Sequence, residues 1–261
     1  MSAASPAPAG AATGAGVATE EGSNPAPRWP PSALAIVAHP DDVDFGAAGT
    51  IAAMVRAGTS VAYCIVTDGQ AGGSDPTVAR SEIAGIRRSE QRAAARVLGV
   101  GDVRFLGYPD GQVFVTTELR RDLARVIRLV QPEVVVTQSP VRDFARIFAS
   151  HPDHLAVGEA TLAAVYPDAR NPFAYPELAA EGLAAHVVAE VWLMGGPAPN
   201  RFVDVTASIE AKASALAAHE SQVDDPARVA EMVRGWAAAT AKRGELGPDR
   251  LAEAFTVVQT G

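Results

Sequence analysis

The sequence has little that would build a disulfide framework, a membrane span or a surface for nucleic acid. Its 261 residues include one cysteine, so no disulfide can form within the chain. No uninterrupted apolar stretch approaches the roughly 20 residues that span a bilayer. The formal net charge is −8, whereas a protein that tracks phosphates needs a basic face. We therefore expect a cytoplasmic protein with a small-molecule substrate, and neither a nucleic acid nor a membrane as partner.

Large apolar side chains are almost absent from residues 1–32, which are mainly Ala, Gly, Pro, Ser and Thr. Such a segment cannot bury enough surface to offset the entropy lost on ordering. It also has neither the basic start nor the continuous apolar core of a secretory signal. We predict a disordered leader over residues 1–32 and a single domain over residues 33–261, which is long enough to bury a substantial core.

Strand and helix patterns alternate through the first half of this domain. Short apolar runs predict strands over 34–38, 60–66, 102–106 and 133–137, and helical patterns over 47–57, 81–98 and 117–130 separate them, the last with Thr117 as its cap. Such alternation with short connections predicts an α/β fold with a Rossmann-like, mostly parallel sheet flanked by helices on both faces. The remainder predicts additional strands near 187–194 and 201–205 and helices near 154–165, 207–219 and 226–243.

Two loops that follow predicted strands are rich in residues that bind metals. The first strand leads into His39-Pro40-Asp41-Asp42, and the loop after the fourth ends in His151-Pro152-Asp153-His154. A single His-Pro-Asp is most often a turn, because Pro and Asp both favour turns. In an open parallel sheet, however, the ligand crevice lies at the carboxyl ends of the strands. Two copies at two strand ends therefore indicate a metal site.

A catalytic zinc takes three protein ligands, imidazole nitrogens and carboxylate oxygens, and keeps a position for water. His39, Asp42 and His154 supply this set, which predicts one zinc ion per chain and no other cofactor. Asp41 and His151 are left for catalysis. Asp41 is expected to take a proton from a metal-bound water, and His151 to stabilise the oxyanion or to protonate the leaving amine.

Several other residues have structural interpretations. Asp44 is either a partner that orients a metal ligand or a helix N-cap, and the cap is favoured. His186 and His219 are expected to be structural or on the surface. Cys64 lies in an apolar run and is expected to be a buried, inert thiol. The glycine-rich segment 68–74 is predicted to be a mobile loop at the pocket edge.

The sequence resembles the PIG-L/LmbE-like zinc N-deacetylases. The resemblance rests on Ala38-His39-Pro40-Asp41-Asp42, Thr67-Asp68-Gly69, Arg87-Arg88-Ser89-Glu90, Tyr108-Pro109-Asp110-Gly111 and His151-Pro152-Asp153-His154. It implies a Rossmann-like fold, hydrolysis of N-acetylglucosamine-type or related N-acyl amides, and the same zinc ligands and catalytic pair. It also implies that Arg87 and Asp110 contact the sugar. Two departures bear on the substrate subfamily: Val43 stands where Glu is common, and Ala149 where some members have a tyrosine.

The resemblance leaves a second enzyme class open. It includes a zinc-dependent hydratase that adds water to a C=C bond of a small unsaturated dicarboxylic acid, which would need cations such as Arg87, Arg142, Arg146 and Arg170. A nucleotide-binding module is disfavoured, because the phosphate-binding pattern G-x-G-x-x-G is absent after the first strand. The segment 219–222 has no assigned role beyond a helix end. The Pro-rich stretch 166–177 could border the pocket or an oligomer contact, which leaves a homo-oligomer open.

Overall fold

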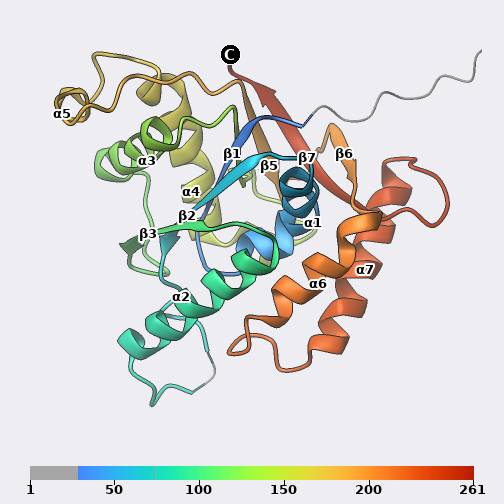
Figure 1. Cartoon of the computed structure of the whole chain (residues 1–261). Helices are drawn as coiled ribbons and strands as arrows, with labels where there is room; N and C mark the ends of the chain where they lie inside the picture. Colours follow the sequence, from blue (N-terminus) through green and yellow to red (C-terminus); the bar gives the residue numbers. More distant parts are fainter. Residues whose placement is uncertain (1–28, 74) are drawn as a thin grey trace, which may run out of the picture.

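The computed structural model describes residues 29–73 and 75–261 (Figure 1). The strands are β1 Ser32–Val37, β2 Ser60–Thr67, β3 Asp102–Tyr108, β4 Val134–Gln138, β5 Glu190–Met194, β6 Arg201–Asp204 and β7 Ala252–Gln259. The α-helices are α1 Asp42–Arg56, α2 Arg80–Val97, α3 Thr117–Val130, α4 Pro152–Ala163, α5 Pro176–Ala180, α6 Ile209–Ala217 and α7 Pro226–Arg243. Short 3-10 helices cover Ile147–Ser150 and Thr206–Ser208, and a π-helix covers Ala164–Ala169.

Most of the predicted leader, residues 1–28, lies outside the described residues. The end of that segment is packed, because the Thr59 hydroxyl donates to the Pro30 carbonyl at 2.7 Å and β1 begins at Ser32. Ordered structure thus begins before residue 33, where the sequence placed the start of the domain.

The strands form one seven-stranded sheet in the order β3-β2-β1-β4-β5-β7-β6. The first five strands of the chain pair in parallel, and β7 pairs antiparallel with both β5 and β6. This confirms the predicted α/β fold with a mostly parallel sheet. The strand order reverses between β1 and β4, since β2 and β3 continue on one side of β1 while β4 lies on the other. A ligand crevice is expected at that reversal.

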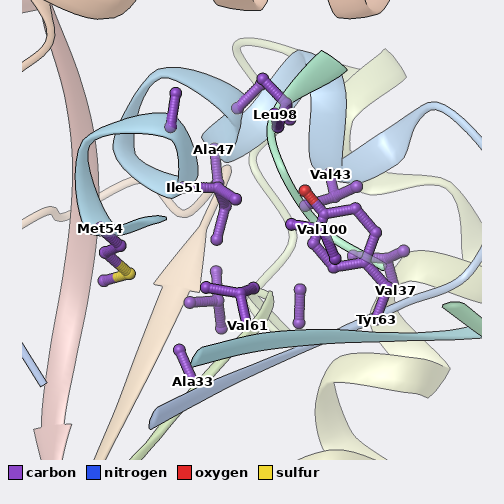
Figure 2. Packing of buried hydrophobic residues seen from close by; sticks show 14 of the residues in the cluster. Ala33, Val37, Val43, Ala47, Ile51, Met54, Val61, Tyr63, Leu98 and Val100 are labelled. Carbon is purple, nitrogen blue, oxygen red and sulfur yellow. The ribbon is translucent and has the colours of Figure 1, made fainter. Parts of the chain in front are cut away.

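Helices cover both faces of the sheet because successive side chains of a buried strand point to opposite sides. On one face Ala33 and Val37 of β1 pack with Ala47 and Ile51 of α1, as Figure 2 shows. That layer also contains residues of α2 and α6. On the other face, alternate residues such as Leu34 of β1 pack with α3 and α4. Both faces are therefore buried, which explains the continuous apolar runs of the central strands.

Helix α1 begins earlier than predicted. It starts at Asp42, with Asp41 as its N-cap, and not after Gly46. Gly46 and Gly49 lie inside the helix because neighbouring side chains leave no room there: an added Cβ would lie 2.3 Å from the Met194 sulfur and 2.8 Å from Val205 Cβ, respectively. The glycines mark close packing, and the early start places Asp42 in the first turn.

Two further details of the helical layer differ from the sequence prediction. The cap of α3 is Thr116 and not Thr117, since the Thr116 hydroxyl accepts from the Leu119 amide at 3.1 Å. The Pro-rich stretch 166–177 contains the π-helix and the start of α5. The buried Arg128 guanidinium donates to the carbonyls of Asp168, Asn171 and Ala174, which holds this stretch against α3. In the part of the chain that is described, every helix is too short or too polar to cross a bilayer.

Cys64 is fully buried in β2, as predicted for an inert thiol. Burial raises the pKa of its thiol to about 12, so almost no thiolate forms near neutral pH. We expect iodoacetamide to leave the native protein unmodified at pH 8 and to alkylate it fully in guanidinium chloride, as measured by intact mass. Rapid alkylation of the native protein would contradict this packing of β2.

Candidate metal and catalytic site

The two predicted loops meet at the strand reversal. β1 ends at Val37 and leads into His39, while its parallel neighbour β4 ends at Gln138 and leads through a longer loop into His154. Gly158 allows α4 to lie close to the end of β4, because a Cβ at this position would lie 2.3 Å from the Gln138 carbonyl oxygen. Chain segments more than a hundred residues apart thus place their polar side chains in one crevice.

The three residues predicted to hold the metal lie together. His39 Nδ1 is 3.2 Å from His154 Nε2, and Asp42 Oδ1 is 3.0 Å from the same nitrogen. Asp42 Oδ2 is 3.4 Å from His39 Nδ1. Two imidazole nitrogens and a carboxylate converging at these distances form a donor set that fits a divalent cation. Further groupings, His39 with His151 and His154 and His39 with Asp110 and Asp153, have ligand atoms within 4.8 Å of one another.

Two carboxylates fix the orientation of His39. Its Nε2 lies 3.1 Å from Asp110 Oδ1 and 3.2 Å from Asp153 Oδ2, which leaves Nδ1 to face His154 and Asp42. Burial lowers the pKa of His39, but the hydrogen bonds to the surrounding carboxylates outweigh it and raise the pKa to about 12. The surroundings of this imidazole therefore favour positive charge strongly, as a cation site requires.

Asp153, inside the second motif, is a site residue for which no separate role was predicted. It is 1% exposed, and its oxygens accept from the amides of Gly111 and Val113 at 2.7 and 3.2 Å. It therefore connects the loop after β3 to His39. Histidines that bind metals commonly donate their second N–H to a carboxylate, so the aspartate inside the second motif could have been assigned this role.

Asp42 is held by a second residue that was missed. Gln138, at the end of β4, donates from Nε2 to Asp42 Oδ2 at 2.7 Å and accepts from the Ala38 amide at 3.1 Å. Burial raises the pKa of Asp42, but the nearby His154 and His39 outweigh this effect and bring the pKa well below its usual value. Asp42 is therefore ionised and aimed at the cluster.

Asp41, which precedes the proposed ligand Asp42, has a left-handed backbone and turns its carboxylate to Arg87. Its φ is 84° and its ψ −24°, a conformation that costs a non-glycine residue on the order of 1 kcal/mol. Its amide donates to Gln91 Oε1 at 2.8 Å, and its Oδ2 accepts from Arg87 Nη2 at 3.0 Å. Burial raises the pKa of Asp41 to about 6, repulsion from Asp42 adds to this effect, and Arg87 opposes it.

Arg87 and Asp110, the predicted sugar contacts, both lie in the site and are only 5% and 7% exposed. Besides Asp41, the Arg87 guanidinium donates to the carbonyls of Pro40 and Gly69 at 2.8 and 2.9 Å. Asp110 Oδ2 accepts from the Ala71 amide at 2.9 Å. These contacts within the chain join the loop after β1 to the glycine-rich segment 68–73, and the contact of either residue with a substrate stays a prediction.

The glycine-rich segment packs closely on Arg87. An added Cβ at Gly69 would lie 2.3 Å from Arg87 Nη1, and one at Gly72 would lie 2.5 Å from the same atom. Gly69 also has a φ of +64°. These two glycines are therefore required by close approach to the guanidinium, and the described part of this segment, residues 68–73, covers Arg87.

His151 lies on the remaining side of the cluster. Its ring centroid is 5.0 Å from that of His39 and 5.4 Å from that of His154, and its Nδ1 accepts from the Asp153 amide at 3.2 Å. Burial lowers the pKa of His151, and the positive charges of His39 and His154 lower it further. Since Nδ1 is the acceptor, its Nε2 is free to carry a proton.

The favoured interpretation of Asp44 is wrong, since the N-cap of α1 is Asp41. Asp44 is fully buried, and its Oδ2 accepts from Gln91 and from His219 at 2.8 and 2.9 Å. His219 is itself fully buried, in agreement with a structural role. His186 contacts the Pro132 carbonyl through Nε2 at 2.8 Å, away from the cluster.

Comparisons with known proteins identify relatives with this organisation. The family model described as GlcNAc-PI de-N-acetylase (PIG-L) matches residues 34–165, which contain both loops. A diacetylchitobiose deacetylase of Thermococcus kodakarensis is 34% identical over 189 residues, 72% of this chain and 69% of that protein. The structure of N,N'-diacetylchitobiose deacetylase from Pyrococcus horikoshii aligns with a TM-score of 0.80 and 30% identity over 88% of this chain and 84% of that chain.

A 4-carboxy-2-hydroxymuconate hydratase from Pseudomonas putida aligns with a TM-score of 0.73 over 88% of this chain and 97% of that chain. Because the two chains are only 22% identical, this comparison shows a shared fold and says nothing about the reaction. The family match and the Thermococcus relative confirm the resemblance seen in the sequence. The chain belongs to the PIG-L (GlcNAc-PI de-N-acetylase) family.

Proposed function

We propose that the protein hydrolyses an N-acyl amide, an N-acetyl group on a sugar-like or related small molecule, with one zinc ion held by His39, Asp42 and His154. The observation that carries this proposal is the convergence of their donor atoms within 3.4 Å of one another. Asp41 directly precedes Asp42 in the chain. The relatives named as deacetylases of N-acetylated chitobiose support the reaction class. We further propose that residues 33–261 act as one hydrolase domain, because a single sheet includes β1 and β7.

A zinc ion bound there would polarise the amide carbonyl and make water more acidic. Asp41 accepts the proton that the attacking water loses, which its pKa near 6 allows at neutral pH. The water oxygen bonds to the carbonyl carbon, the C–N bond breaks, and the proton passes to the amine nitrogen. His151 donates a hydrogen bond to the developing oxyanion or delivers that proton. The products are a free amine and a carboxylate, acetate for an N-acetyl substrate.

Substrate binding is proposed for Arg87 and Asp110, which border the cluster. Asp110 Oδ1 lies 3.1 Å from His39 Nε2. The same carboxylate can also accept a hydrogen bond from a sugar hydroxyl. Arg87 already donates to Asp41 and to two carbonyls, so its effect on substrate passes partly through the loops that it holds. A variant of Arg87 should therefore change kcat as well as KM.

The direct test is elemental analysis of the purified protein, followed by amine release from N-acetylglucosamine, diacetylchitobiose and other N-acyl glycosides. About one zinc per chain, with amine and acetate released in equal amounts, would support the proposal. Amine release that survives complete removal of metals would overturn the zinc mechanism. Zinc without amine release from any of these amides would overturn the assigned reaction and leave the metal site standing.

The hydratase alternative has less support. Three of the four cations named for it have polar partners within the chain: Arg87 bonds Asp41 at 3.0 Å, Arg146 bonds Asp143 at 3.1 Å, and Arg142 donates to the Ser150 carbonyl at 3.2 Å. The fourth, Arg170, lies over the Tyr166 ring, 5.4 Å from its centroid. No specific observation thus favours a dicarboxylic acid. Loss of dienoate absorbance in the presence of the zinc-loaded protein would reverse this preference.

Asp153→Asn tests the residue that orients His39. The amide keeps the volume but removes the charge that stabilises the imidazole N–H, so we expect the zinc Kd to rise about 10- to 100-fold. Competition with a chromogenic chelator measures this change. Asp143→Asn is the matched control, because Asp143 lies in the loop before α4 and bonds Arg146 instead. Equal zinc affinity in both variants would contradict the role of Asp153.

A further inference from the structure

The segment that follows α6 has no part in the proposed reaction, yet it reaches the site through buried contacts. His219 is fully buried, and its Nε2 lies 2.9 Å from Asp44 Oδ2. Ser221 extends the contact on the surface, since its amide and hydroxyl both donate to Glu90 of α2 at 2.7 Å. The segment therefore contacts both α1 and α2 where these helices approach the catalytic loop.

A chain of hydrogen bonds connects His219 to the backbone of Asp41. Asp44 Oδ2, which accepts from His219, also accepts from Gln91 Nε2 at 2.8 Å. The other end of the Gln91 amide accepts from the Asp41 N–H at 2.8 Å. Asp44 Oδ2 accepts from the Gln91 NH₂ group, and this contact fixes which end of the Gln91 amide faces Asp41. His219, Asp44 and Gln91 are all fully buried, so water does not compete for these bonds.

The last bond of this chain acts at a strained residue. Asp41 has a φ of 84° and is the N-cap of α1, but its side chain makes no capping hydrogen bond. Its carboxylate is instead turned to Arg87. A non-glycine residue keeps such a backbone only when its surroundings hold it there. The Gln91 oxygen holds the Asp41 N–H, and the direction of the carboxylate depends on that peptide.

The packing of α6 against α1 does not depend on His219 alone. Helix α6 is also anchored independently, because Lys212 donates to the Phe45 carbonyl and to Glu253, both at 2.6 Å. The contacts of Lys212 therefore hold α6 in place without the bond from His219 to Asp44.

We infer that His219, acting through Asp44 and Gln91, is a positioning residue that holds the Asp41 peptide and thereby fixes the direction of the Asp41 carboxylate. The inference rests on the proposed function, in which Asp41 is the general base. It gives the segment 219–222 a role that the sequence left unassigned. The His219 imidazole bonds Asp44, and among the described residues it makes no hydrogen bond to a proposed zinc ligand.

The test compares His219→Leu, which removes the donor, with His219→Gln, whose amide can still donate to Asp44. Since a small misplacement of a catalytic group is costly, we expect kcat to fall about 10-fold or more in the leucine variant with KM nearly unchanged. The glutamine variant should keep most of the wild-type kcat. Gln91→Met removes the next bond in the chain and should lower kcat in the same way, which keeps the test open should His219→Leu fail to fold.

Leu216→Ala is the matched control. Leu216 is fully buried in α6, one turn before His219, and is not part of the network. This variant should lower Tm without lowering kcat per zinc-loaded molecule. If kcat falls equally in Leu216→Ala and His219→Leu, the effect of His219 is only structural and the inference fails.

The amide resonance of Asp41 in the ¹⁵N NMR spectrum gives a readout that needs no substrate. We expect its shift and its hydrogen-exchange rate to change in His219→Leu, to recover in His219→Gln and to stay unchanged in Leu216→Ala. An Asp41 amide that is identical in wild type and His219→Leu would overturn the inference. If the wild type releases no amine from any tested amide, the proposed function fails, and this amide resonance still decides whether His219 positions Asp41.

Discussion

Asp41→Asn is expected to lower kcat for amide hydrolysis by about 10²- to 10⁴-fold, the usual contribution of a general base. The asparagine amide cannot accept the proton that water loses, whereas the rest of the residue is preserved. Asparagine tolerates the left-handed backbone seen at φ 84°, and its carbonyl oxygen can still accept from Arg87. The variant should therefore fold and bind zinc like the wild type.

Steady-state kinetics and zinc content measured on the same samples check this expectation. The wild-type rate should fall as the pH decreases, because the base works only when deprotonated and burial raises the pKa of Asp41 to about 6. A bound cation favours the ionised form of Asp41, so the fall in rate should occur at lower pH. The residual activity of Asp41→Asn should not show this fall in rate. Wild-type kcat in a zinc-loaded Asp41→Asn variant would rule out Asp41 as the base.

The two loops of the candidate metal site could be predicted because their residues are neighbours in sequence and follow apolar runs. His39 and Asp42 belong to one motif, His154 ends the other, and parallel strands bring their carboxyl ends to one edge of the sheet. The distances of 3.0 to 3.4 Å between their donor atoms agree with that reasoning. Local sequence was therefore sufficient for this part of the candidate site.

The residues that orient these groups could not be predicted in the same way. Gln91 is 50 positions from Asp41, whose amide it binds, and Gln138 is 96 positions from Asp42. Nothing in their local sequence separates either glutamine from one on a helix surface or at a strand end. Their role depends on the packing of α2 against α1 and of β4 against β1, which the alternation of strands and helices does not specify.

Strand β7 was missed because a buried acid interrupts its apolar pattern. Glu253 lies inside the strand and is 6% exposed. Its carboxylate bonds Lys212 at 2.6 Å and accepts from the amides of Gly49 and Thr50 in α1. A charge is normally kept out of such a position, and only its pairing with a lysine from α6 makes the burial acceptable. That pairing joins residues 41 positions apart and leaves no periodic signal.

His154→Ala is expected to abolish stable zinc binding and amide hydrolysis together. The imidazole is the donor that the second loop contributes, and its Nε2 lies within 3.2 Å of both His39 Nδ1 and Asp42. Losing a direct ligand should cost more than the roughly 10- to 100-fold in affinity that loss of an outer partner costs. Elemental analysis after dialysis should find about one zinc in the wild type and almost none in the variant.

Thermal unfolding separates loss of the ligand from loss of the fold. Free zinc at 1,000 times its Kd would raise the free energy of unfolding of the wild type by about 4 kcal/mol. A chelator should therefore lower the wild-type Tm and leave the Tm of His154→Ala unchanged. His186→Ala is the matched control, because the His186 imidazole bonds the Pro132 carbonyl at 2.8 Å, away from the proposed ligands. It should keep the zinc, the activity and the response to the chelator. A His154→Ala variant that retains one tightly bound zinc would show that the cation is held elsewhere, with the grouping of His39, Asp110 and Asp153 as the next candidate.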